Sequence, residues 1–188
     1  LGALMAPFTR VAARNPYAWF PTERSAEELI TPGAGNRMIS YPYPKYLNAV
    51  LITDQAAGVL MCDVQTARRL GVPEDRWVYW HGGADTSERA WHVSERPEIG
   101  ASPALAECAR RTFVNAFAQP GATARDIDHF DFYSCFPVAV ELGCEAYGVT
   151  EDDPRGLTVT GGLPYAGGPG NNYSLHSLAA MAQRLRAR

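Results

Sequence analysis

Residues 157–176, LTVTGGLPYAGGPGNNYSLH, have the clearest capacity for binding chemistry in this chain. They place five glycines and two prolines before a pattern that predicts a helix over Leu175 to Arg188. Glycine adopts backbone angles closed to other residues, and a helix start has unpaired N–H donors. A carbonyl oxygen, a developing oxyanion or a phosphate could bind there against the backbone. The candidate binding residues are Gly161, Gly162, Tyr165, Gly167, Gly168, Asn171, Asn172 and Tyr173.

A second candidate region lies where a predicted strand meets a helix. Residues 127–133, IDHFDFY, alternate between apolar and polar side chains, which predicts a strand, and the pattern from Phe136 to Tyr147 predicts a helix. Ligands bind at the carboxyl ends of strands in open α/β sheets. Tyr133 and Cys135 at this junction are therefore candidate catalytic residues.

These residues also have plain structural interpretations. Cys135 could be a small buried hydrophobic residue, and Tyr133 a packed aromatic at a strand end. His176, one turn into the last helix, is a third candidate catalytic residue, but it could only hydrogen-bond a carbonyl. The two asparagines before that helix could serve as caps.

The elements around these candidates alternate along the chain. Helices are predicted over 4–13, 64–71 and 103 to about 118, and buried strands over 56–63 and 76–82. Residues 15–46 form a long irregular stretch with five prolines. This alternation predicts an α/β layered domain, with helices packed on a mixed or parallel sheet.

Composition excludes several classes of protein. The 188 residues are 46% hydrophobic and 20% charged, as in globular proteins, and the net charge of −3 argues against nucleic-acid partners. No apolar run approaches the roughly 18–20 residues of a membrane span.

The cysteines lack CxxC spacing, which favours reduced thiols in the cytoplasm over disulfides or a metal site. Cys62, Cys108 and Cys144 are predicted on core faces. The aromatic group Trp77, Tyr79, Trp80 and Trp91 predicts a core or a subunit interface.

Three motifs resemble the thiolase superfamily, particularly its sterol-carrier-protein type. IDHFDFYSCFPVAVELGCEAYG resembles the strand, turn and helix that carry His-Asp-Cys-Phe in that type. The glycine loop resembles the superfamily's Gly-Gly…Gly-His-Pro loop, and ITDQAAGVLMCDVQTARRLG resembles its Thr-Asp-Gly-Ala-Ala segment. The motifs occur in family order across nearly all of residues 15–185.

The resemblance implies a layered α/β fold of two similar halves, with helices on a mixed five-stranded sheet, of which this chain holds only part. Residues 1–50 would end the N-terminal half and its loop region, residues 51–100 would link the halves, and residues 101–188 would form an incomplete C-terminal half. Both termini look cut, so we expect a longer protein. The resemblance also implies a homo-oligomer, or a partner that supplies the missing half.

The resemblance implies activity on acyl-coenzyme A thioesters as substrates, with no permanently bound cofactor, by forming or cleaving a carbon–carbon bond. Two departures matter: Gly168 stands where the histidine of Gly-His-Pro should be, and Tyr133 where the histidine of His-Asp-Cys-Phe should be. Losing one oxyanion donor typically costs about 10²–10³ in rate. The alternatives are a retro-aldol lyase on thioesters of steroid-like side chains that uses Tyr133, and a non-catalytic acyl-coenzyme A carrier or assembly subunit.

Overall fold

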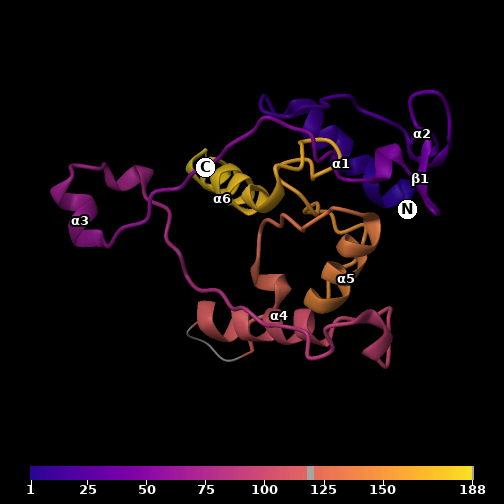
Figure 1. The fold of residues 1–188 in the computed structure, drawn as a ribbon. Helices are drawn as coiled ribbons and strands as arrows, with labels where there is room; N and C mark the ends of the chain where they lie inside the picture. Colours follow the sequence, from indigo (N-terminus) through magenta and orange to yellow (C-terminus); the bar gives the residue numbers. More distant parts are fainter. Residues whose placement is uncertain (118–120, 188) are drawn as a thin grey trace.

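The computed structural model describes residues 1–117 and 121–187. The longer helices in Figure 1 are α1 (Gly2–Arg14), α2 (Ala26–Ile30), α3 (Val64–Arg69), α4 (Pro103–Ala116), α5 (Pro137–Tyr147) and α6 (Tyr173–Arg186). The short elements are β1 (Met38–Ser40), β2 (Tyr43–Pro44), η1 (Lys45–Leu47), η2 (Glu74–Arg76), η3 (Val93–Glu95), η4 (Ala124–Asp126) and η5 (Gly170–Asn172), where η denotes a 3-10 turn. The predicted helices are confirmed, although positions 118 and 188 of two of them lie outside the described residues.

Local sequence signals account for the helix boundaries. The Ser102 hydroxyl accepts a hydrogen bond from the Leu105 N–H at 3.2 Å, which caps α4 at its start. Asp63 caps α3 in the same way through the Thr66 N–H, at 2.7 Å. Gly148 ends α5 with φ +64°, a left-handed conformation that favours glycine.

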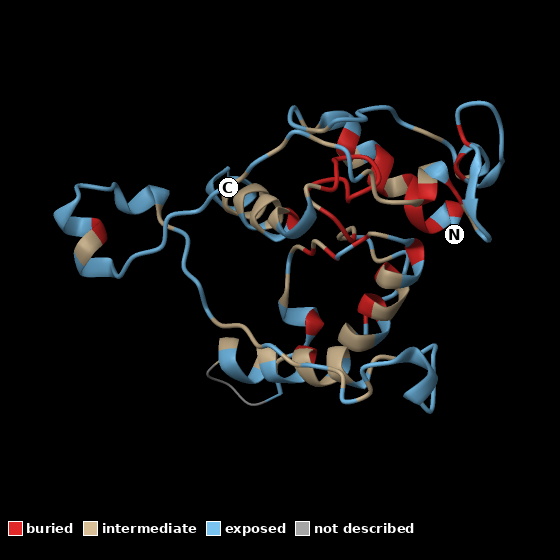
Figure 2. Ribbon diagram, viewed as in Figure 1, coloured by how far each residue is buried: buried red, intermediate tan, exposed pale blue. Residues whose placement is uncertain are grey.

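The hydrophobic core extends from the buried face of α1 through Leu29 of α2 and the segment around Phe132 to α5. One face of α1 is buried, and the glycine loop at 161–168 is buried beside it, as Figure 2 shows in red. The core cluster includes Leu4, Met5, Phe8, Leu29, Leu47, Phe130, Phe132, Val140, Leu157 and Tyr165. Complete burial of a large apolar side chain stabilises a fold by about 1.5–3 kcal/mol. This core therefore holds the glycine loop and the turn after Phe132 in place.

The expectation of a five-stranded mixed sheet is wrong for the described residues. Their only sheet is the antiparallel pair β1–β2, in register Met38 opposite Pro44. The segments 56–63, 76–82 and 127–133, predicted as strands, are not assigned as strands. A strand requires a row of hydrogen bonds to a neighbouring chain. In 127–133 the Phe132 N–H donates to the Leu157 carbonyl at 2.9 Å, but the segment is not part of a sheet ladder.

The prediction for Cys62 is wrong, and so is the core alternative for two of the tryptophans, whereas the subunit-interface alternative stays a prediction. Cys62 is exposed, although it was expected on a core face, whereas Cys144 is buried and Cys108 half-buried. Trp80 and Trp91 are 61% and 85% exposed, so these two rings do not form a core. Within residues 1–117 and 121–187, no strand neighbours the segments that carry Cys62 and Trp80.

Residues 63–76, which include α3, form a lobe that stands apart from the rest of the chain (Figure 1). We call this segment the α3 lobe. Two extended arms, residues 58–62 and 78–81, join it to the body. The Arg186 guanidinium at the end of α6 donates to the Arg76 carbonyl at 2.8 Å. Among the described residues, no helix is long and apolar enough to cross a membrane.

Candidate functional site

The turn that carries Tyr133 and Cys135 is positioned by two buried phenylalanines. Phe130 and Phe132 stack at 5.4 Å on the core side of the segment. Gly143 of α5 lies against Phe132, where an added Cβ would lie 3.1 Å from the ring, so α5 packs closely on this segment. The opposite face holds Asp131 and Tyr133, which confirms the predicted alternation. At the end of this segment, Tyr133 is half-exposed and Cys135 is half-buried.

Residues 49 and 50 join this turn to the glycine loop. The Ala49 N–H donates to the Cys135 carbonyl at 2.9 Å. Val50 donates to the Leu163 carbonyl at 3.3 Å and accepts from the Gly168 N–H at 2.9 Å. The two candidate regions, far apart in sequence, therefore lie on either side of one short extended segment.

A buried serine makes a second link between the turn and the loop. Ser134 is fully buried, and its hydroxyl accepts from the Leu163 N–H at 3.1 Å. Gly161 and Gly162 have φ of +103° and +79°. A Cβ at Gly161 would overlap Ala12 of α1, so this loop requires glycine both for its backbone angles and for close packing.

Asp131 organises the loop from the turn side. One carboxylate oxygen accepts the backbone N–H groups of Val159 and Thr160, at 2.8 and 2.9 Å, and the Thr158 hydroxyl at 3.2 Å. The other oxygen accepts the hydroxyls of Tyr173 and Ser177, both at 2.9 Å. Asp131 thus connects the 129–137 segment, the glycine loop and α6. Sequence reasoning missed this role, although the residue's place on the Tyr133 face was a usable signal.

Tyr133 and Cys135 are both protonated at neutral pH. Burial raises the pKa of the Tyr133 phenol, and Cys135 adds to the rise. Burial also raises the pKa of the Cys135 thiol, against the lowering effect of backbone N–H groups at Phe136 and at Cys135 itself. A protonated phenol is a hydrogen-bond donor, and a protonated thiol is a weak nucleophile. This turn is therefore suited to donate hydrogen bonds and unsuited to attack a carbonyl through sulfur.

His176 lies in a different part of the structure from Tyr133. It lines an open cavity of about 1280 Å³ between α1 and α6, together with Gly167, Tyr173 and Gln55, whereas Tyr133 and Cys135 do not line that cavity. Burial lowers the pKa of the His176 imidazole, which is therefore neutral at pH 7. Its Nε2 atom is buried without a hydrogen-bond partner among the described residues.

Tyr173 connects these two parts of the site. Its ring meets the ring of Tyr133 edge to face at 5.9 Å, and it also lines the cavity. Its hydroxyl lies 2.8 Å from that of Thr160, and burial raises its pKa well above the ordinary value. Tyr173 therefore stays protonated and serves to hold the loop against α6.

The remaining predicted binding residues have varied environments. Asn172 exchanges two hydrogen bonds with the backbone of Ala57, at 2.7 and 3.0 Å, and its side chain makes no capping bond to α6. Asn171 is exposed. Tyr165 is 2% exposed within the core cluster, and its hydroxyl has no partner among the described residues. Its ring therefore serves the core, and its binding role stays a prediction.

No family model and no curated protein matches the chain. Among solved structures, the chain is similar to a monomeric SCP2-thiolase-like protein of type 1 from Mycobacterium smegmatis. The TM-score is 0.86 and the sequence identity 46%, over 100% of this chain and 40% of that protein. The chain thus spans two fifths of the length of the protein it matches. The resemblance found in the sequence motifs is supported at the level of fold, and the chain has an SCP2-thiolase-like fold.

Proposed function

We propose that the protein acts on acyl-coenzyme A thioesters of bulky acyl chains, forming or cleaving a carbon–carbon bond. The observation that carries this proposal is the junction at residues 49 and 50, which holds the Tyr133 turn and the glycine loop together in a chain with an SCP2-thiolase-like fold. Backbone N–H groups and a phenol are suitable donors for the oxygen of a thioester, which gains negative charge when an enolate forms.

The chemistry of the turn favours retro-aldol cleavage over acyl transfer as the reaction. In a retro-aldol step, a base removes the proton of a β-hydroxyl, the Cα–Cβ bond breaks, and a carbonyl product and a thioester enolate form. The enolate then takes a proton. Such a step needs no acyl-cysteine, which agrees with the raised pKa of the Cys135 thiol. In this proposal the Tyr133 phenol donates a hydrogen bond to the developing enolate oxygen.

The environment of Gly168 favours the same alternative. A Cβ at this position would lie 2.9 Å from the Val50 carbonyl oxygen, so a histidine here would require the backbone to shift. The loop is thus built without the imidazole that the Gly-His-Pro motif would supply. We do not assign the base of this step to His176, because its Nε2 atom is buried and Tyr133 does not line the cavity that His176 lines.

The experiment is a product analysis by mass spectrometry with two substrates. One is a β-hydroxyacyl-coenzyme A with a bulky side chain, and the other is a 3-ketoacyl-coenzyme A with free coenzyme A. Tyr133→Phe should reduce retro-aldol turnover by about 10²-fold, the typical value of one oxyanion donor, with little change in thioester binding. Tyr41→Phe is the matched control, because Tyr41 is 89% exposed.

Each outcome separates the proposed functions. Thiolysis that Tyr133→Phe leaves intact would favour acyl transfer and would refute the retro-aldol role. Tight thioester binding without turnover of either substrate, unchanged in Tyr133→Phe, would favour a carrier or an assembly subunit. A protein that binds neither thioester would refute the proposal as a whole.

A further inference from the structure

The direction of the Tyr133 side chain depends on a contact with Tyr173. The two rings meet edge to face, with centroids 5.9 Å apart and planes at 86°. Tyr133 is 52% exposed, and within residues 1–117 and 121–187 its hydroxyl makes no hydrogen bond and its ring meets no other aromatic ring. Edge-to-face pairs are attractive and directional, because the positive edge of one ring faces the negative face of the other. The Tyr173 ring is therefore the described group that can fix where the phenol points.

Tyr173 is itself held firmly in place. It is the first residue of α6 and is 3% exposed. Its hydroxyl donates to the Asp131 carboxylate at 2.9 Å and lies 2.8 Å from the Thr160 hydroxyl. A buried ring that is anchored by its backbone at one end and by its hydroxyl at the other has little freedom to turn. It can therefore serve as a fixed support for a more exposed neighbour.

Asp131 and Tyr133 are placed so that one side chain can contact both. They are two residues apart on the same face of an extended segment, a separation of about 7 Å. Tyr173 spans this separation, with its hydroxyl at Asp131 and its ring at Tyr133. Because Asp131 also accepts the backbone N–H groups of Val159 and Thr160, the same contacts set the Tyr133 phenol in a fixed relation to the glycine loop.

We propose that Tyr173 is a positioning residue, whose ring holds the Tyr133 phenol in the orientation that lets it donate a hydrogen bond to the thioester oxygen. This inference rests on the proposed function. It differs from the expectation that Tyr173 binds the substrate directly, because here Tyr173 acts only through Tyr133. Misplacing a catalytic group by about 1 Å can cost about 10² in rate. Loss of the Tyr173 ring should therefore lower kcat and leave the Kd of the thioester unchanged.

A double-mutant cycle measures this coupling through kcat for the β-hydroxyacyl-coenzyme A. Tyr173→Leu should lower kcat about tenfold in the parent but less than about twofold in Tyr133→Phe, where the hydroxyl to be positioned is gone. Tyr173→Phe keeps the ring and loses its hydroxyl contacts, so we expect an intermediate loss that is again absent from Tyr133→Phe. This milder variant decides the question if Tyr173→Leu does not fold.

A second readout does not require turnover. The protein is labelled with tyrosine that carries ¹³C in its ring, and the Tyr133 NMR signal is the one that Tyr133→Phe removes. The ring current of Tyr173 displaces this signal, so Tyr173→Leu should move it toward the position of free tyrosine.

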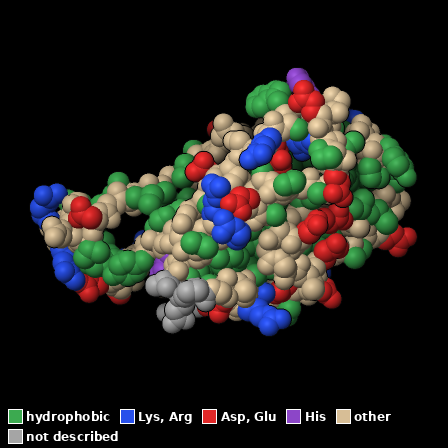
Figure 3. Space-filling model, turned by 90° about the horizontal axis from the view of Figure 1, so that it is seen from below, with side chains coloured by type: hydrophobic (Ala, Val, Ile, Leu, Met, Phe, Trp, Pro, Cys, Tyr) green, Lys and Arg blue, Asp and Glu red, His purple; other side chains and the backbone are tan. Residues whose placement is uncertain are grey.

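Tyr79→Leu is the matched control. The Tyr79 ring makes the same kind of contact, with Trp77 at 6.3 Å and 78°, and it lies in the second arm of the α3 lobe. Figure 3 shows this lobe standing off the body. We expect Tyr79→Leu to leave kcat and the Tyr133 signal unchanged.

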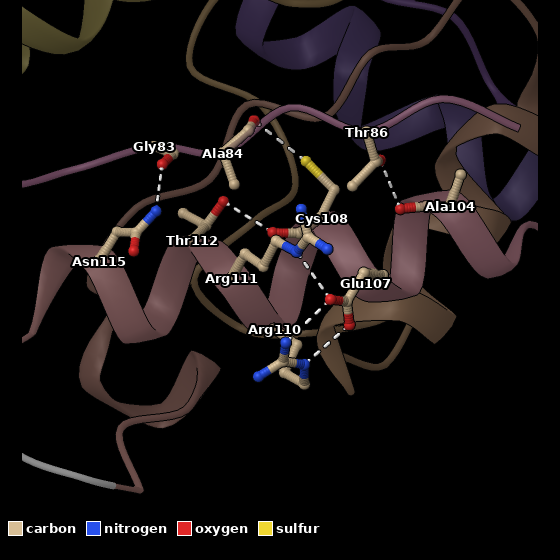
Figure 4. Close-up of polar contacts among 10 residues, drawn as sticks. All are labelled: Gly83, Ala84, Thr86, Ala104, Glu107, Cys108, Arg110, Arg111, Thr112 and Asn115. Carbon is tan, nitrogen blue, oxygen red and sulfur yellow. Dashed lines mark hydrogen bonds and ion pairs between the residues drawn. The ribbon is translucent and has the colours of Figure 1, made fainter.

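Contacts that share no residue with Tyr133 or Tyr173 report whether each variant stays folded. Residues 83–86 lie along α4, as Figure 4 shows. There the Asn115 amide donates to the Gly83 carbonyl at 2.8 Å, and the Thr86 hydroxyl donates to the Ala104 carbonyl at 2.7 Å. Hydrogen exchange of the α4 amides should stay slow in every variant that is compared.

The outcomes distinguish this inference from the proposed function. Equal losses of kcat in the parent and in Tyr133→Phe would give Tyr173 a purely structural role and overturn the inference. A raised Kd for the thioester with unchanged kcat would overturn it in favour of direct binding. An unmoved Tyr133 signal in Tyr173→Leu would overturn it whether or not the protein turns over a substrate. If the parent turns over neither substrate while the signal moves as expected, the proposed function fails and the contact that orients Tyr133 is still supported.

Discussion

Replacing Asp131 with alanine should destabilise the protein by about 2–6 kcal/mol. The carboxylate accepts the backbone N–H groups of Val159 and Thr160, and no other acceptor for them appears within the described structure. An unsatisfied buried donor costs about 1–3 kcal/mol, so two donors give this range. Domains are stable by about 5–15 kcal/mol in total, so the loss would be large. The released hydroxyl of Tyr173 keeps its contact with Thr160 and adds little.

Two further variants make this prediction specific. Asp131→Asn keeps one oxygen for the two N–H groups, and the facing hydroxyls of Tyr173 and Ser177 can rotate to accept from its amide, so it should cost less than the alanine variant. Asp75→Ala, at an exposed position on η2, is the control and should change stability by no more than about 0.5 kcal/mol.

Urea unfolding of the four proteins measures these free energies, and hydrogen exchange follows the Thr160 amide directly. We expect this amide to exchange faster in Asp131→Ala than in the parent protein. Equal stability of the Asp131→Ala and Asp75→Ala proteins, with unchanged exchange at Thr160, would refute the role assigned to Asp131.

Three other outcomes follow from the structure. Gly161→Ala should lower the free energy of unfolding by more than about 1 kcal/mol, because φ is +103° and the added carbon would overlap α1. Gly33 has open space around it, so Gly33→Ala is the control and should change the free energy of unfolding little in the same urea titration. Iodoacetamide at pH 8 should modify exposed Cys62 first and buried Cys144 last, since burial raises the pKa of Cys144 to about 11. Peptide mapping measures the rate of modification at each cysteine, and equal rates at Cys62 and Cys144 would contradict this prediction. A hydrogen-bonded arginine lowers the pKa of Asp153 to about 2, so its stabilising contribution is present above about pH 4 and is lost as the pH falls toward 2. Asp153→Asn should therefore reduce stability at pH 7 but not at pH 2, and an equal loss at both would contradict the ion pair.

Local interactions made most of the helices predictable. Ser102 with the following proline, Asp63 before α3 and Gly148 after α5 act within one helical turn, so their effect can be read from neighbouring residues. The alternation around Phe132 was predictable for the same reason. Its strand assignment was not, because strand formation depends on a pairing partner that is not specified by neighbouring residues.

The candidate site likewise combines features that the sequence predicts with contacts that only the tertiary structure shows. The sequence alone determined which residues could donate hydrogen bonds, at the turn of Tyr133 and in the glycine loop, because this capacity resides in residue type and backbone freedom. Only the tertiary structure decided that Ala49 and Val50 join these regions, that Asp131 binds the loop to α6, and that His176 faces a separate cavity. Those contacts bridge residues far apart in the chain, and the burial that sets the pKa values of Tyr133 and Cys135 exists only once the core has formed.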